Sequence, residues 1–179
     1  REFDRSVDDW VEGHRSPALD RVFYGLSSAG DHSLLWVAIG SVREVVGWGR
    51  PGSALRLTGF LAAESAFTNG PLKSMFRRVR PDLDPTLTEG PLPYGLRRPV
   101  TSAFPSGHAT SAFAAAAFLA KGDPLGPAYH VLAAAVAASR VYVRLHHASD
   151  VVAGAALGLA FGRVARLLAP SAGNSRPDA

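Results

Sequence analysis

The sequence contains no cysteine. A chain without thiols forms neither a disulfide framework nor a thiolate metal site, and it gives no sign of its redox compartment. It also lacks a basic start followed by a short apolar core and a small-residue cleavage site, so we expect no signal peptide. No internal repeat or low-complexity segment is evident. With 179 residues, the chain has the length of one domain with its own core.

The positive charge does not have the pattern of a nucleic-acid-binding protein. The formal net charge is +4 and the sequence pI is about 10.0. The basic residues lie beside apolar stretches, however, and are not interleaved with the aromatic side chains on which bases would stack. Hydrophobic residues make up 47%, an ordinary fraction, but they are concentrated in runs such as 113–120 and 151–161. We therefore expect no nucleic-acid partner.

Hydrophobic spacing divides the chain into three parts. Residues 1–30 have the pattern of amphipathic, interfacial helices. Residues 31–170 are predicted to form a single catalytic membrane domain, and residues 171–179 a disordered tail. Within the domain we expect helices over five stretches, which glycine and proline separate: 32–46, 52–68, 104–120, 127–145 and 149–168. A proline-rich loop is expected over 81–100.

Each of these stretches approaches the roughly 20 residues that a membrane-spanning helix needs. Arg56 and Glu64 then require partners or a position facing protein, since a charge at the centre of a spanning helix costs about 2.5–3.5 kcal/mol. Glycine and alanine in the last three stretches permit close helix contacts in lipid. We predict an all-α, multi-pass transmembrane bundle of about five to six helices. The alternative is a soluble, alanine-rich helical bundle.

Three clusters of polar residues lie near the ends of these stretches. In the first, Lys73 and Arg80 are seven residues apart, so a helix would place both on nearly one face. Converging donors of this kind can hold a phosphate, Arg as a rigid fork and Lys as a point charge. Taken alone, the segment also fits a basic juxtamembrane cluster, to which Arg77 and Arg78 would belong.

The second cluster, Pro105-Ser106-Gly107-His108, stands where an apolar helix begins. Free N–H groups at a helix N-terminus bind anions, Ser106 can cap the helix or donate, and Gly107 allows a close approach of the backbone. His108 would stand beside a bound phosphate and could protonate a leaving oxygen. An ordinary Ser cap followed by an interfacial His is the alternative.

The third cluster contains Arg140, His146 and Asp150. Four residues separate His146 from Asp150, so the carboxylate can accept a hydrogen bond from one ring nitrogen and leave the other as a nucleophile. Asp150 could also cap a helix starting at Val151. A metal site built from the histidines and Asp150 is conceivable, but no His-Glu-x-x-His pattern occurs and the nearby cations would repel a metal. We expect no metal.

Together and in this order, the three clusters resemble the three-part signature of the type 2 phosphatidic acid phosphatase family. The resemblance covers Lys73 to Asp150 and implies an all-helical core with metal-independent phosphoryl transfer. By this resemblance, His146 is the nucleophile that forms a phosphohistidine, Asp150 orients it, and His108 protonates the leaving group. The phosphoryl oxygens would be held by Lys73, Arg80, Ser106, Gly107 and Arg140.

The resemblance also implies the competing activities. Soluble acid phosphatases and vanadate-dependent haloperoxidases share the family's core, because vanadate resembles the phosphoryl transition state. The small chain and its apolar helices favour the membrane lipid phosphatases, and the outline is similar to actinobacterial members, some of which are fused to a diacylglycerol kinase-like domain. We therefore expect no cofactor, and vanadate as an inhibitor and transition-state mimic.

The expected substrate is a lipid phosphate in the bilayer: phosphatidic acid, a polyprenyl phosphate or pyrophosphate, or a polyprenyl-phosphoryl sugar phosphate. Arg97 and Arg98 could contact a second phosphate, which favours a polyprenyl pyrophosphate or a polyprenyl-phosphoryl sugar phosphate as the substrate. A non-catalytic membrane protein that binds anionic lipid is the alternative from another class. By the positive-inside rule, the face of a membrane protein that is rich in basic residues is cytoplasmic. The face expected to lie opposite the site is basic, which favours an extracytoplasmic site; its basic residues are Arg43, Arg50, Arg56, Lys121, Arg163 and Arg166.

Overall fold

The computed structural model describes residues 2–81 and 101–168, apart from the side chains of His32 and Leu168, and these residues are helical without any strand. The predicted all-α class is confirmed. The predicted tail, most of the predicted loop and the residues Arg97 and Arg98 lie outside the described residues.

Two helices form the N-terminal part, α1 (Glu2–Gly13) and α2 (Pro17–Ala29). The chain breaks between them because Ser16 adopts an extended conformation, its side chain accepts from the Leu19 N–H, and Pro17 opens the next helix. Val11 of α1 is buried in the core, whereas Phe3 and Trp10 are more than half exposed. The amphipathic pattern of α1 is therefore real, with one face packed on the bundle.

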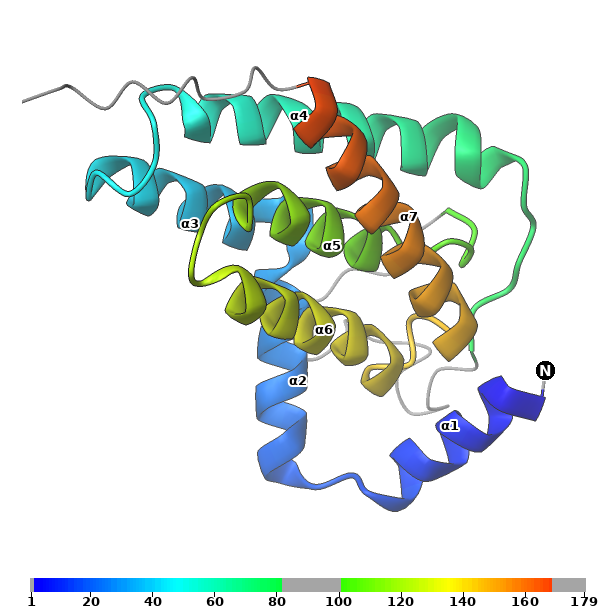
Figure 1. The fold of residues 1–179 in the computed structure, drawn as a ribbon. Coiled ribbons are helices and arrows are strands. Elements are labelled where there is room, and N and C mark those ends of the chain that lie inside the picture. The colour runs from blue at the N-terminus through cyan, green and yellow to red at the C-terminus, as the bar shows by residue number, and fades with distance from the viewer. Residues whose placement is uncertain (1, 82–100, 169–179) are drawn as a thin grey trace, which may run out of the picture.

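The five predicted stretches form five helices (Figure 1): α3 (Leu34–Val45), α4 (Ser53–Phe67), α5 (Gly107–Leu119), α6 (Gly126–Tyr142) and α7 (Ala148–Leu168). A short 3-10 turn, η1 (Asp31–Ser33), precedes α3. A π-helical turn, η2 (Thr68–Leu72), prolongs α4 towards Lys73. Helix α7 begins at Ala148, one residue before the predicted start, so Asp150 lies in its first turn and is not the residue that precedes the helix.

Helix α5 is the centre of the bundle, with α4, α6 and α7 packed around it (Figure 1). It is apolar on nearly all sides, and most of its alanines are fully buried. A helix that is apolar all round needs neighbours on every side. Small side chains let those neighbours approach closely, as the composition of this stretch predicted.

Three glycines, each four residues from the next, bring the backbone of α7 against α5. A Cβ atom added at Gly158 would lie 2.2 Å from the carbonyl oxygen of Thr110, and one at Gly154 would lie 2.5 Å from that of Ser106. At Gly162, an added Cβ would lie 2.5 Å from the side chain of Ala117. No side chain fits along this seam, which extends to the N-terminal ends of both helices.

Apolar side chains on the outward faces suit contact with lipid. Leu55, Val131, Val152 and Leu167 are each at least 60% exposed, and they lie on α4, α6 and α7. Exposed apolar surface of this extent marks contact with a membrane or a partner. Among the described residues, one helix is long and apolar enough to span a bilayer by itself, over Ala148–Leu167. The buried Glu64 has the predicted partners, since Ser111 and Thr68 both donate to it.

The segment from Lys73 to Arg80 corrects one prediction. Its helix ends just after Lys73, and residues 76–80 have no regular structure. Pro81 disfavours the helical conformation at Arg80 itself, and the helix has already ended at Ser74. The two cations therefore do not share a helix face. Lys73 lies at a helix end and Arg80 in an irregular segment, and both line the same cavity.

Candidate active site

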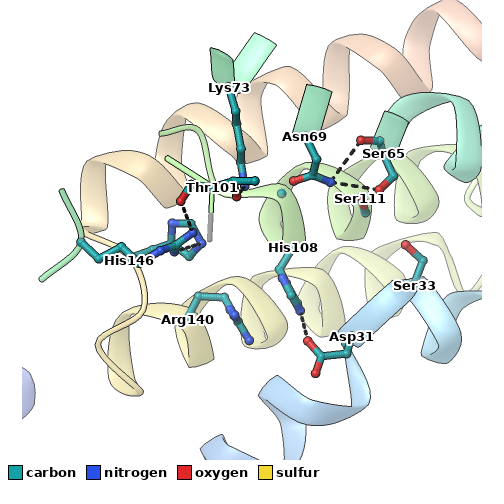
Figure 2. A pocket seen from close by; sticks show the side chains of 13 residues that line it. Asp31, Ser33, Ser65, Asn69, Lys73, Thr101, His108, Ser111, Arg140 and His146 are labelled. Atoms are coloured by element: carbon teal, nitrogen blue, oxygen red, sulfur yellow. Dashed lines mark hydrogen bonds and ion pairs between the residues drawn. The ribbon is translucent and has the colours of Figure 1, made fainter. Parts of the chain in front are cut away.

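Polar side chains from several helix ends meet around one cavity of about 250 Å³ (Figure 2). It lies where η1, the end of η2, the start of α5 and the connection from α6 to α7 come together. Six of the eight predicted site residues line it or lie at its edge through their side chains or backbone: Lys73, Arg80, Gly107, His108, Arg140 and His146. Ser106 and Asp150 lie just behind this wall.

His146 follows α6 after a tight turn. Arg144 adopts the left-handed conformation, with φ of 56°, and the N–H groups of Leu145 and His146 both donate to the carbonyl of Arg140. The imidazole is 2% exposed. Its Nδ1 lies 2.7 Å from the carbonyl oxygen of Ala103, and Arg80 approaches Nε2 at 3.1 Å. This arrangement fixes the proton on Nδ1 and leaves a lone pair on Nε2.

The pKa of His146 is lowered to about 3, mainly by burial and further by the cations around it, with Asp150 opposing the shift. Burial disfavours the charged imidazolium, and so do the neighbouring Arg80 and Lys73. The ring is therefore neutral at physiological pH, which a nitrogen nucleophile requires.

Asp150 does not make the hydrogen bond to His146 that the spacing allowed. Its Oδ2 lies 3.7 Å from Nδ1 of His146 and instead accepts from the N–H of His147 at 2.9 Å. The carbonyl of Ala103 takes the place expected for the carboxylate. Asp150 is fully buried, so its negative charge still acts on the ring at this distance.

Arg78 holds Asp150 and was given no role by the sequence. Its guanidinium lies 2.7 Å from Oδ1 of Asp150, 2.9 Å from Oγ of Ser149 and 2.6 Å from Asp4. Asp4 of α1 also accepts from the N–H of Ser149 at 2.8 Å. The amphipathic α1 is thus tied to the turn that carries His146, a link that no local pattern indicates.

Three cations face the same cavity from different elements, and two of them, Lys73 and Arg140, are buried. Arg80 donates to the carbonyls of Leu145 at 2.6 Å and Thr101 at 3.0 Å. Arg140 is 1% exposed and donates to Ser27 from Nη1, while its buried Nε has no hydrogen-bond partner among the described residues. Lys73 reaches Oγ1 of Thr101 at 3.4 Å. Such a cluster is poorly compensated without an anion between the three.

The effect of burial and of repulsion between these cations is seen at Lys73. Its pKa is lowered to about 8, first by burial and then by repulsion from Arg80 and Arg140. Asp150 and Glu64 oppose the shift. A bound anion would restore the charge of Lys73, so the shift reports a site that favours a negatively charged ligand.

The N-terminus of α5 borders the cavity at Gly107. A Cβ added there would lie 3.0 Å from Oδ1 of Asn69 and 3.6 Å from Nζ of Lys73. Ser106 is fully buried, and its Oγ caps α5 by accepting from the N–H of Ala109. The hydroxyl thus has the capping role, and its predicted contact with phosphate stays a prediction. Glycine leaves room for an anion against the helix N-terminus.

His108 extends from α5 to Asp31 (Figure 2). Its Nε2 lies 2.7 Å from Oδ1 of Asp31 in η1. No local pattern marks Asp31 as a partner of His108, because the two residues are 77 positions apart in the chain. Asp31 fixes the orientation of the ring and favours its protonated form, whereas burial and the cations Arg140 and Lys73 oppose protonation.

Hydroxyl and amide groups form another wall of the cavity: Ser33, Ser65, Asn69 and Ser111 (Figure 2). Asn69 donates to Oγ of Ser65 at 3.0 Å, and Ser111 donates to the buried Glu64 at 2.5 Å. None of the four belongs to a recognisable motif, and they come from four separate elements, η1, α4, η2 and α5. Only the fold brings them together.

The comparisons with known proteins agree with this geometry. A family model described as the PAP2 superfamily matches residues 53–173. The decaprenylphosphoryl-5-phosphoribose phosphatase of Mycobacterium tuberculosis is 31% identical over 144 residues, covering 78% of this chain and 75% of that protein. The protein of that name from Mycolicibacterium smegmatis is 33% identical over 131 residues, covering 72% of this chain and 67% of its own.

Two solved structures have the same fold. The transmembrane PAP2-type phosphatidylglycerolphosphate phosphatase of Bacillus subtilis aligns with a TM-score of 0.72 at 26% identity, covering 91% of this chain and 82% of that one. LpxE of Aquifex aeolicus aligns at 0.69 with 23% identity, covering 90% and 93%. The family model matches more than half of the chain, and the histidines, cations and helix N-terminus lie at one cavity. The chain therefore belongs to the PAP2 superfamily and is a phosphatase that hydrolyses phosphoric esters.

Proposed function

We propose that this chain removes a terminal phosphate from a hydroxyl-rich head group of a membrane lipid, through a phosphohistidine on His146. The observation that carries the proposal is the neutral His146, whose Nε2 lies at a cavity lined by three cations. A nucleophile and an anion-binding cluster in one cavity are the two requirements of phosphoryl transfer by a protein side chain.

In the first step, Nε2 of His146 attacks phosphorus, the new P–N bond forms, and the P–O bond to the lipid head group breaks. Lys73, Arg80 and Arg140 bind the phosphoryl oxygens and stabilise their charge, with the N-terminus of α5 at Gly107. His146 becomes cationic as it is phosphorylated. The carbonyl of Ala103 holds Nδ1–H, and Asp150 at 3.7 Å stabilises the developing positive charge.

His108 supplies the proton for the leaving oxygen. Because Asp31 engages Nε2, Nδ1 is the nitrogen left to face the head group. In the second step His108 takes a proton from water, the water oxygen attacks phosphorus, and the P–N bond breaks to release inorganic phosphate. Acid and base work are thus done by one residue in turn.

The head group that we favour is a sugar phosphate on a polyprenyl phosphate. The relatives at 31% and 33% identity are decaprenylphosphoryl-5-phosphoribose phosphatases. The wall of Ser33, Ser65, Asn69 and Ser111 offers hydrogen-bonding groups that match sugar hydroxyls, whereas the two acyl esters of phosphatidic acid have no donor to offer them. We place the site on the extracytoplasmic side. Intact cells should then hydrolyse p-nitrophenyl phosphate, which does not cross the membrane.

We expect His146→Ala to abolish turnover, by on the order of 10⁴-fold or more, because no other group replaces the nucleophile. With radiolabelled p-nitrophenyl phosphate, His108→Ala should accumulate an alkali-stable, acid-labile phosphoenzyme, since the leaving phenolate needs no proton but the attacking water needs a base. The double variant should take up no label. Vanadate should inhibit the native enzyme, and a chelator should not. Label retained on His146→Ala would refute the assignment.

Asp31→Asn should slow the hydrolysis of lipid phosphates by about tenfold or more, because His108 loses the carboxylate that favours its protonated form. The same variant should hydrolyse p-nitrophenyl phosphate at nearly the native first-step rate, measured as the burst of phenolate. The limb of the kcat profile on which activity falls as His108 loses its proton should also shift to lower pH. Asp9→Asn, an exposed carboxylate on α1, is the control. An equal loss on both substrates would indicate a purely structural role for Asp31.

The pH dependence of kcat/KM should report Lys73. As pH rises through about 8, Lys73 loses its proton and the site loses one of three positive charges, so kcat/KM should fall on the alkaline side. Lys73→Arg keeps its charge over this range, and its profile should stay flat to higher pH. The measurement covers pH 7 to pH 10 with one substrate. A native profile that is flat across this range would contradict the role of Lys73.

Asn69→Ala and Ser65→Ala should each lower kcat/KM for decaprenylphosphoryl-5-phosphoribose by about fivefold, the value of one hydrogen bond. Turnover of phosphatidic acid should change much less, so the ratio of the two kcat/KM values is the measurement. Ser74→Ala is the control, because this exposed hydroxyl bonds to Pro71 outside the cavity. If the native enzyme prefers phosphatidic acid, or the ratio is unchanged in both variants, the sugar-phosphate assignment is wrong.

A further inference from the structure

A second cavity, of about 750 Å³, lies at the opposite end of the bundle. The end of α3, the turn into α4 and the C-terminal ends of α5 and α7 enclose it. Leu119 at this cavity and His108 at the active site lie on the same helix, eleven residues apart, which is roughly 16 Å along the α5 axis. The two cavities are therefore separate sites on opposite ends of one helix.

The lining of this second cavity is cationic at its rim and apolar at its floor. Among the lining residues are five cations and no carboxylate: Arg43, Arg50, Arg56, Lys121 and Arg166. The floor contains Phe60 and Phe118, whose rings stack with centroids 5.6 Å apart, and Leu119. A site with both surfaces suits an amphiphile that has an anionic head and an apolar body.

Two nearby carboxylates offset only part of this charge. Asp123 pairs with Arg43, and Glu44, which accepts from the backbone N–H groups of Gly52 and Ala54, interacts with Arg56. Within the described residues, no ion pair is formed by three of the cations: Arg50, Lys121 and Arg166. The rim therefore carries net positive charge that is available to a ligand.

We propose that this cavity binds the phosphate head group of an anionic phospholipid from the leaflet opposite the active site, with an acyl chain against Phe60 and Phe118. Arg50, Lys121 and Arg166 would contact the phosphate. The positive-inside rule explains why basic residues gather on one face, but it does not require them to surround a cavity with an apolar floor. The lipid would secure the ends of α3, α5 and α7 to one another. This binding is independent of the catalytic proposal.

The test is lipid binding by the purified full chain in a non-denaturing detergent, with phosphatidylglycerol and phosphatidylcholine compared by native mass spectrometry. We expect selective retention of phosphatidylglycerol. Arg50→Gln with Arg166→Gln should weaken it roughly thirtyfold, given the usual contribution of each cation beside an anionic lipid surface. The matched control is Arg21→Gln with Arg163→Gln, which removes two exposed cations that do not line the cavity and should leave binding unchanged.

Three outcomes would overturn the proposal. Equal retention of the two lipids would exclude recognition of the anionic head group. Equal loss in both double variants would show a general attraction to charge and no defined site. Displacement of the lipid by equimolar glycerol 3-phosphate would show that the cavity takes soluble phosphate esters and that the apolar floor plays no part. The thermal unfolding midpoint of each variant, measured without lipid, confirms that the variants are folded.

Discussion

The close contact of α5 with α7 is the constraint on which the site depends. Because Gly154 and Gly158 have no side chains, the two backbones touch, and the N-terminal ends of the two helices lie side by side. The N–H of Ser106 then donates to the carbonyl of Asp150 at 3.1 Å, which ties the start of α5 to the first turn of α7. Gly107 is the first residue of α5, and His146 lies just before α7. A seam of small residues thereby sets the position of the anion site relative to the nucleophile.

The active site requires positive charge to be removed from water, which is energetically unfavourable. The cations at the active site receive carbonyl oxygens and hydroxyls as partners, which hold their geometry without cancelling their charge. Lys73 shows the consequence in its lowered pKa. The buried carboxylate of Asp150, which lies close to His146, is itself paired with Arg78, so the cavity as a whole keeps its attraction for an anion. Charge that would be neutralised in a purely structural core remains available to a substrate here.

The helices and most residues of the candidate site could be predicted from the sequence, because both depend on local patterns. Apolar runs broken by glycine and proline predicted five helices to within a few residues, and the short motifs around His108 and His146 predicted most of the residues that line the cavity. What it missed is non-local. Asp31, Arg78 and the wall around Asn69 act through contacts between distant segments, and nothing in their neighbouring residues marks them. The helix predicted through Arg80 was wrong, because a seven-residue spacing shows only where two side chains would lie if a helix were present and does not show that the helix continues beyond Ser74.

The partners of the two histidines give physical grounds for assigning their roles. His146 donates to a neutral carbonyl and is surrounded by cations, so its environment disfavours the imidazolium and keeps a lone pair on Nε2. Burial and the cations Arg140 and Lys73 also disfavour a proton on His108, but this ring has a carboxylate at 2.7 Å that partly offsets them. Of the two rings, His108 is therefore the one with a carboxylate within hydrogen-bonding distance to support a proton during its transfer, whereas Asp150 lies 3.7 Å from His146. The unequal environments of two identical side chains therefore favour His146 as nucleophile and His108 as acid.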